Sequence, residues 1–268
     1  MTLRTVFSII LVFALTVHIT AQQAPRNHDS NHARAVALWE EVIQAKGGRE
    51  RLHAVENVLI VSKVNLSTLP QFNPREARRL FVLPDRAWLK GSLHGSTADM
   101  EIVVQSIKQG RCTTKMSPTG APLPGPLPCT FPGASSYLMR DPITYLLETK
   151  WIKPQIMTAR VEGRGSKRVD IVEVELMRLR MEFYLDNKTR LPFKVVIKKS
   201  AANARFDAHP ETTIQFSDYA VFDGIQMPRS IKRETQLDRW ALPDRETETA
   251  QYSFNIVYDK SLFDEQTP

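Results

Sequence analysis

Residues 214–228 read IQFSDYAVFDGIQMP, and this short run carries the strongest structural signal in the chain. Ile214 and Phe216 alternate with polar residues, as on a strand that buries one face. The Asp-Gly step at 223–224 lies between apolar residues, which is the pattern of a two-residue β-hairpin turn. The run therefore predicts two antiparallel strands joined by a tight turn.

Similar alternation extends from this hairpin in both directions. Short connections are also expected at 163–165 and 186–190, and strands joined by short turns pair antiparallel because parallel strands need a long crossover. A meander of eight to ten strands must curl, since strands twist. The fold class predicted is α+β, mainly β: a curved antiparallel meander, or half-barrel. Its strands are expected at 57–66, within 77–89, at 100–107, 169–176, 181–185, 191–197, 214–216 and 252–258.

Two helical segments are expected beside these strands. One runs from about Asn31 to Lys46, with Asp29 or Ser30 as its N-cap and Gly47-Gly48 as its stop, followed by a short helical turn. The other covers 135–149. The sheet is expected to wrap around these helices, and any apolar lining that they leave uncovered would form a cavity for a small ligand.

The first 21 residues have the pattern of an export signal. Arg4 precedes an apolar run at 6–17 that is shorter than a membrane span, and a cleavage site is expected near Ala21. The alternative is an uncleaved membrane anchor. We therefore divide the chain into a signal peptide (1–21), a flexible polar segment (22–30) and one domain (31–268), and expect a periplasmic or secreted protein of a bacterial envelope.

Charge and cysteine content limit the classes of function that the chain can have. The net charge is +7, but the basic residues are spread in short groups such as 75–79 and 229–233, which are typical of solvated faces. Without an interleaved basic and aromatic motif, nucleic acid is not an expected partner. In an oxidising compartment Cys112 and Cys129 favour a disulfide that closes a proline-rich loop. A metal or redox pair is the alternative.

No catalytic motif is recognisable. His28 and His32 have helical metal-ligand spacing, but no third ligand is evident and there is no HExxH sequence. No GxSxG nucleophile motif occurs either. The carboxylates at 173, 175 and 182 are expected on solvent-facing strand positions rather than as an acid–base pair. We therefore predict no enzyme activity, no cofactor and no metal.

Several segments together resemble a known group. The helix ending in Gly47-Gly48, the strand–turn–strand at 184–192, the hairpin at 218–228 and the closing pair at 262–263 are similar to those of the outer-membrane lipoprotein carriers (the LolA/LolB/RseB N-terminal-like superfamily). The resemblance implies a half-barrel around helices, with an apolar cavity suited to acyl chains. Members carry lipoproteins, transport lipids or sense envelope stress, and they share no catalytic residue. The proline-rich loop departs from the pattern.

The leading hypothesis is an exported binding protein that holds a hydrophobic ligand, a lipid or lipoprotein acyl chain, as carrier or sensor. Peripheral contact with a membrane would fit this function. The alternative is an envelope protein-interaction module that uses the proline-rich loop at 112–129 to bind a protein partner. The side chains expected to line the cavity are Trp88, Ile102, Val104, Phe183, Phe193, Val195, Phe216, Phe254 and Ile256.

Overall fold

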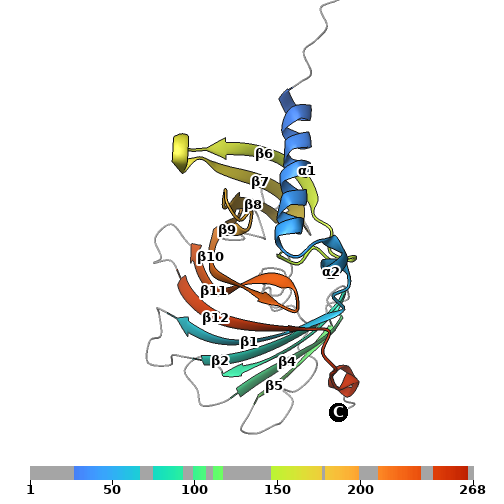
Figure 1. Cartoon of the computed structure of the whole chain (residues 1–268). Helices are drawn as coiled ribbons and strands as arrows, with labels where there is room; N and C mark the ends of the chain where they lie inside the picture. Colours follow the sequence, from blue (N-terminus) through green and yellow to red (C-terminus); the bar gives the residue numbers. More distant parts are fainter. Residues whose placement is uncertain are drawn as a thin grey trace, which may run out of the picture.

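The computed structural model shows one open β-sheet (Figure 1). It describes residues 27–66, 75–92, 99–106, 111–116, 146–176, 179–198, 211–236 and 244–264. The elements in these ranges are α1 (Asn27–Ala45), α2 (Arg49–His53), β1 (Asn57–Leu66), β2 (Arg75–Val82), β3 (Arg86–Ser92), β4 (Asp99–Ser106), β5 (Arg111–Met116), β6 (Gln155–Glu162), η2 (Gly165–Lys167), β7 (Val169–Leu176), β8 (Leu179–Leu185), β9 (Pro192–Ile197), β10 (Glu211–Phe222), β11 (Ile225–Gln236), β12 (Asp244–Phe254) and η3 (Lys260–Phe263).

All twelve of these strands belong to the same antiparallel sheet, in the order β5-β4-β3-β2-β1-β12-β11-β10-β9-β8-β7-β6. The sheet is two meanders, β1–β5 and β6–β12, joined where β1 pairs with β12 from Val58↔Phe254 to Leu66↔Glu246. The predicted mainly-β class and curved antiparallel architecture are confirmed (Figure 1). The chain does not pass continuously from one meander to the other, because β5 and β6 are consecutive in the chain but lie at opposite edges of the sheet.

The predicted hairpin turn is confirmed between β10 and β11. Asp223 and Gly224 have φ angles of 50° and 81°, the left-handed values that a twisted two-residue turn requires. This turn packs on the end of α1, where the backbone N–H of Gln226 donates to the Lys46 carbonyl at 2.9 Å. A Cβ on Gly47, which has φ 125°, would lie 2.4 Å from the Gly224 carbonyl oxygen. Only glycine permits this close approach.

Helix α1 lies against β6 and β7 and begins at Asn27, four residues earlier than expected. Asp29 and Ser30 are therefore inside the helix rather than at its cap. The Trp39 ring packs edge-on against Phe183, with 5.0 Å between ring centroids. Arg34 pairs with Asp170 of β7, and Arg190 reaches the same carboxylate at 3.0 Å. Apolar packing and these ion pairs together fix the helix to the sheet.

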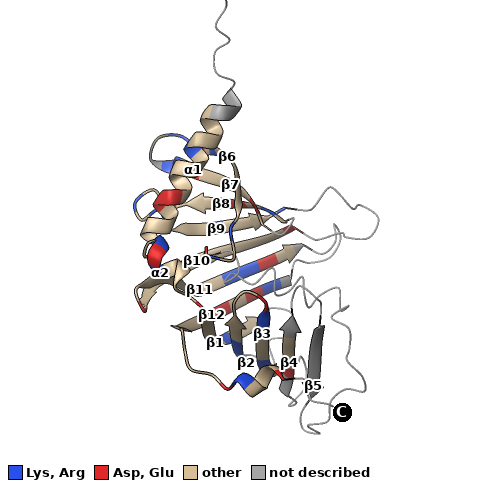
Figure 2. Ribbon diagram, turned by 90° about the vertical axis from the view of Figure 1, so that its right-hand side faces the viewer, with Lys and Arg blue, Asp and Glu red and all other residues tan. Residues whose placement is uncertain are grey.

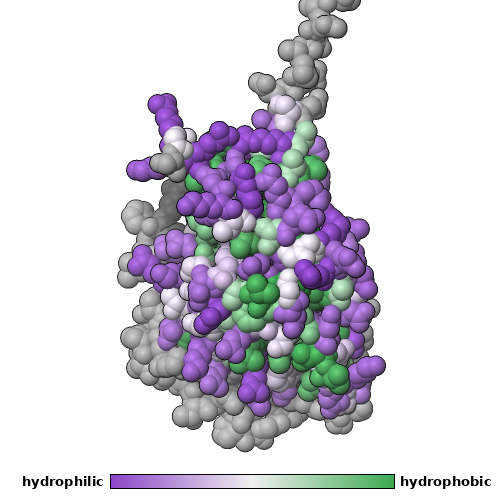
Figure 3. Space-filling model, viewed as in Figure 1, coloured by the Kyte–Doolittle hydropathy of each residue, from purple (hydrophilic) through white to green (hydrophobic). Residues whose placement is uncertain are grey.

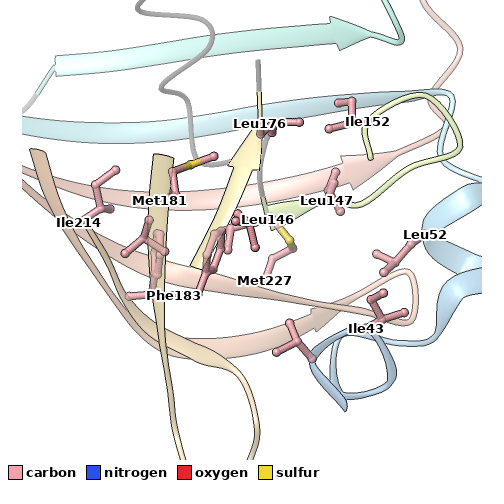
Figure 4. Close-up of a cluster of buried hydrophobic side chains, with 14 of the residues drawn as sticks. Ile43, Leu52, Leu146, Leu147, Ile152, Leu176, Met181, Phe183, Ile214 and Met227 are labelled. Carbon is pink, nitrogen blue, oxygen red and sulfur yellow. The ribbon is translucent and has the colours of Figure 1, made fainter. Parts of the chain in front are cut away.

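Each face of the sheet carries its own apolar cluster. We call the face against which α1 packs the inner face, and it carries the larger cluster, part of which appears in Figure 4. The outer face carries a smaller cluster built around Leu80, Val103 and Phe263, so η3 covers β3 and β4. The expected strand at 252–258 ends at Phe254, and the chain beyond it turns to this outer cluster.

Several predictions fall outside the residues that the structure describes. These include the signal peptide (1–21), most of the expected helix at 135–149, the proline-rich loop and Cys129. The disulfide and the loop-based interaction module therefore stay predictions, although Cys112 lies on β5. Among the described helices, none combines the length and the apolar character needed to span a membrane.

Candidate functional site

The inner face brings together most of the predicted ligand-lining side chains. Val104, Phe183, Val195, Phe216 and Phe254 are buried there. Ile102 is partly buried and packs against the same cluster. These residues come from strands on both sides of the β1–β12 junction, so strand pairing collects them on one surface. Their role in binding stays a prediction, since all six also serve as ordinary core.

The three other predicted residues do not join this surface. Trp88 and Ile256 pack in the outer cluster, because Trp88 pairs with Leu80 and Val103, whose side chains point outward. Phe193 is exposed, with its ring 6.4 Å from that of Tyr184. The pairing of β8 with β9 shifts register beside this position, between Tyr184 and Leu185.

The inner face changes character along its strands. At one end, which we call the turn end, the strands are joined by tight turns such as 83–85, 186–191 and 223–224. The segment 146–152 adds buried apolar side chains to this region, and Figure 4 shows Leu146 and Leu147 beside Met227. The core is therefore filled largely by the protein's own residues here.

A small pocket lies within the turn end. Its volume is about 10 Å³, which is room for one water molecule and far too little for an acyl chain. The Glu148 carboxylate beside it accepts a hydrogen bond from Trp39 Nε1 at 2.6 Å and pairs with Arg49. The residues that line the pocket are Trp39, Val42, Ile43, Lys46, Leu52, Leu146, Glu148, Phe183 and Pro192.

Lys46 is the buried cation of this pocket. Burial lowers the pKa of its amine from 10.5 to about 7, because charge is costly away from water. Its Nζ donates to the Gln226 carbonyl at 3.3 Å and lies 3.6 Å from Met227 Sδ. The contacts are weak, and they attach α1 to the hairpin between β10 and β11.

The opposite end of the inner face is polar. We call it the loop end, since there the strands lead into 67–74, 177–178, 199–210 and 237–243. Figure 2 shows Lys, Arg, Asp and Glu residues on β11 and β12. Five inner-face side chains form what we call the polar cluster: Ser62, Arg79, Arg233, Glu246 and Glu248.

Two ion pairs organise the polar cluster. Arg79 of β2 reaches across β1 and donates to Glu248 of β12, and these side chains are only 7% and 2% exposed. Arg233 and Glu246 face each other on β11 and β12, with 2.9 Å between Nη1 and Oε2 and exposures of 12% and 16%. Opposite charges in contact compensate much of the cost of burial.

Ser62 lies on β1 between the partners of the first pair. It is opposite Ala77 of β2 and Ala250 of β12, two residues from Arg79 and Glu248 respectively. Ser62 Oγ and Glu248 Oε2 are both buried, and neither has a hydrogen-bond partner among the residues described. Such a buried group costs about 1–3 kcal/mol unless a ligand or water satisfies it. The cluster therefore has unused hydrogen-bonding capacity.

The outer-face carboxylates do not form an acid–base pair. Glu173 and Glu182 are opposite each other on β7 and β8, but Glu182 pairs with Arg160 at 2.9 Å and Lys198 at 3.1 Å. Burial opposes ionisation of Glu182, yet these hydrogen bonds and charges leave its pKa below the usual value. The expectation that it faces solvent is wrong, because the Glu182 side chain is largely buried.

The described residues hold no evident metal site, and the face drawn in Figure 3 shows no large continuous apolar patch. No group of three metal-ligating side chains occurs in the described part of the chain, and His32 Nδ1 lies 3.1 Å from the Met157 carbonyl oxygen. In Figure 3 the apolar groups on the visible face are separated by hydrophilic ones. Scattered apolar residues of this kind are ordinary on protein surfaces. The inner face is the better candidate site.

Comparison with known proteins gives a structural answer only. No family model matches the sequence, and no curated protein matches it. A DUF1329 family protein from Desulfovibrio piger aligns with a TM-score of 0.50 and 9% identity, over 86% of this chain and 97% of that one.

Two further structures align at a TM-score of 0.49. A LolA superfamily protein from Nitrosomonas europaea has 11% identity over 85% of this chain and 96% of its own. A putative outer-membrane lipoprotein-sorting domain from Vibrio parahaemolyticus has 10% identity over 88% and 98%. Both names belong to the group that the sequence resembles. At such low identities the comparison establishes for this chain the fold alone, which is that of the Desulfovibrio piger protein.

Proposed function

We propose that this chain is a cell-envelope binding protein that holds the apolar part of a lipid or acylated protein against its inner face. The observation that supports it is the surface at Leu89 and Ile102, which pair across β3 and β4. Both side chains extend the main core but are only partly buried. Helix α1 packs against β6 and β7, in the other meander. This part of the sheet is therefore the natural place for a bound acyl chain.

The gain from such binding is sufficient for a carrier. Each methylene moved from water into an apolar environment contributes about 0.8 kcal/mol, so eight methylenes contribute about 6 kcal/mol. Alone, a gain of about 6 kcal/mol corresponds to a dissociation constant of about 40 µM, and the lost freedom of the ligand makes binding weaker than that. An affinity this modest suits a protein that must release its cargo. Binding rather than catalysis is the proposed role.

Lipid extraction and a binding titration test this proposal. We expect mass spectrometry of extracts from the natively produced protein to detect acyl lipids, and a fluorescent long-chain fatty acid to bind the delipidated protein. Ile102→Glu places a charge on the binding surface and should weaken binding at least tenfold. Val61→Glu is the matched control, because Val61 is an exposed β1 residue on the outer face.

Circular dichroism and thermal unfolding would verify that both variants fold. Absence of lipid in the extracts, together with no uptake by the wild-type protein, would overturn the proposal. Equal weakening by the two variants would place the ligand somewhere other than the inner face.

A further inference from the structure

The polar cluster has a chemical imbalance that points to a ligand. Its two arginines and two glutamates balance in charge, yet Ser62 Oγ and Glu248 Oε2 remain buried without a hydrogen-bond partner in the described residues. A carboxylate oxygen accepts hydrogen bonds, while a serine hydroxyl both accepts and donates. A group that donates to Glu248 and also engages Ser62 would satisfy both atoms.

Charge decides between the possible groups. A ligand carboxylate or phosphate would bring an uncompensated negative charge beside the open oxygen of Glu248, and burying such a charge is costly. An ammonium would leave the cluster with an uncompensated positive charge. A neutral hydroxyl donates and accepts without changing the net charge, so the cluster fits a hydroxyl best.

The position of the cluster connects it with the apolar surface. Arg79 of the polar cluster lies opposite Leu89 of β3, and Leu89 pairs with Ile102 of β4. An amphiphile whose chain lies on Leu89 and Ile102 would therefore have its headgroup beside the polar cluster. The partial exposure of Arg233 and Glu246 brings the edge of the cluster to solvent.

We infer that the polar cluster binds the hydroxyl-bearing headgroup of a neutral acyl ester, of the monoacylglycerol type, through Ser62 and Glu248. This inference rests on the proposed function and adds to it the class of lipid headgroup. Arg79 and Arg233 are positioning residues in this site, because they hold the two carboxylates.

Three ligands with the same acyl chain test the inference: a 1-monoacylglycerol, the methyl ester and the free fatty acid. Their affinities for the full chain would be measured by competition with the fluorescent fatty acid. We expect the monoacylglycerol to bind about tenfold more tightly than the methyl ester, the ratio expected of one buried hydrogen bond. The free acid should not exceed the ester.

Ser62→Ala should reduce this preference to less than threefold. The matched control is Ser253→Ala, an exposed serine on the outer side of β12, which should keep the wild-type preference. If the wild-type protein binds all three ligands equally, or Ser62→Ala keeps the preference, the inference is overturned while the proposed function stands. If none of the three binds, the proposed function fails as well.

Discussion

The turn end and the loop end of the inner face both bury charged groups, but in opposite ways. Lys46 at the turn end is a single amine, and its pKa falls to about 7 because burial disfavours its charge. Arg79 and Glu248 at the loop end are in direct contact, so each compensates the other. Burial of this single amine destabilises the folded protein, and it follows from the packing of α1 on the hairpin. The paired groups keep oxygen atoms available for a ligand.

Breaking the loop-end pair should have the largest effect. Arg79→Met leaves Glu248 buried without its partner, and we expect a loss of about 3–5 kcal/mol in the free energy of unfolding, measured by urea denaturation. Adding Glu248→Met should recover most of this loss, since a buried pair exchanged for apolar side chains is often neutral. A loss below about 1 kcal/mol in the single variant would show that the pair is not buried in solution.

At the turn end, Gly47→Ala is expected to cost about 3 kcal/mol. Its Cβ would meet the Gly224 carbonyl oxygen at a backbone φ that disfavours alanine. Gly165→Ala is the control, because Gly165 also has a positive φ, 57°, but nothing lies within 4 Å of its Cβ position. Its cost should be about 1 kcal/mol. Equal costs in urea denaturation would contradict direct backbone contact between α1 and the hairpin.

Lys46→Met should stabilise the protein by about 2 kcal/mol at pH 6. The pKa of the Lys46 amine is about 7 in the folded protein, and its ordinary value is 10.5. Between pH 7 and pH 10.5 the unfolded chain therefore binds one proton more than the folded protein does. Wild-type stability therefore rises with pH across this window, and the advantage of the variant shrinks toward pH 10. Urea denaturation at pH 6, 8 and 9.5 measures the difference. A constant difference would show that the amine stays charged when buried.

The smallest effect is expected for an exposed pair on the same two strands as Arg233 and Glu246. Arg245 Nε lies 3.4 Å from Glu234 Oε2, and the side chains are 63% and 52% exposed. Arg245→Gln should change the unfolding free energy by less than about 0.5 kcal/mol, because water screens such pairs. A larger loss of unfolding free energy, measured by thermal or urea unfolding, would show that exposed ion pairs stabilise this protein as buried pairs do.

Local patterns in the sequence predict most strands and turns, since alternation and the Asp223-Gly224 step depend on neighbouring residues. The β1–β12 junction has no such local signal, because its partners are far apart in the chain. The polar cluster was also missed. Arg79 and Arg233 lie in basic groups that were interpreted as solvated, yet strand alternation from Phe81 and Ile231 would have placed both on the inner face.

The junction between the two meanders has a consequence for biosynthesis. β1 is the first strand that the structure describes, and its neighbour β12 is the last, so β1 cannot acquire that neighbour until residues 244–254 have left the ribosome. Contacts so distant in sequence form slowly, because a long loop must close first. A nascent chain arrested before residue 244 would expose one long side of β1, which leaves time for chaperones to engage it.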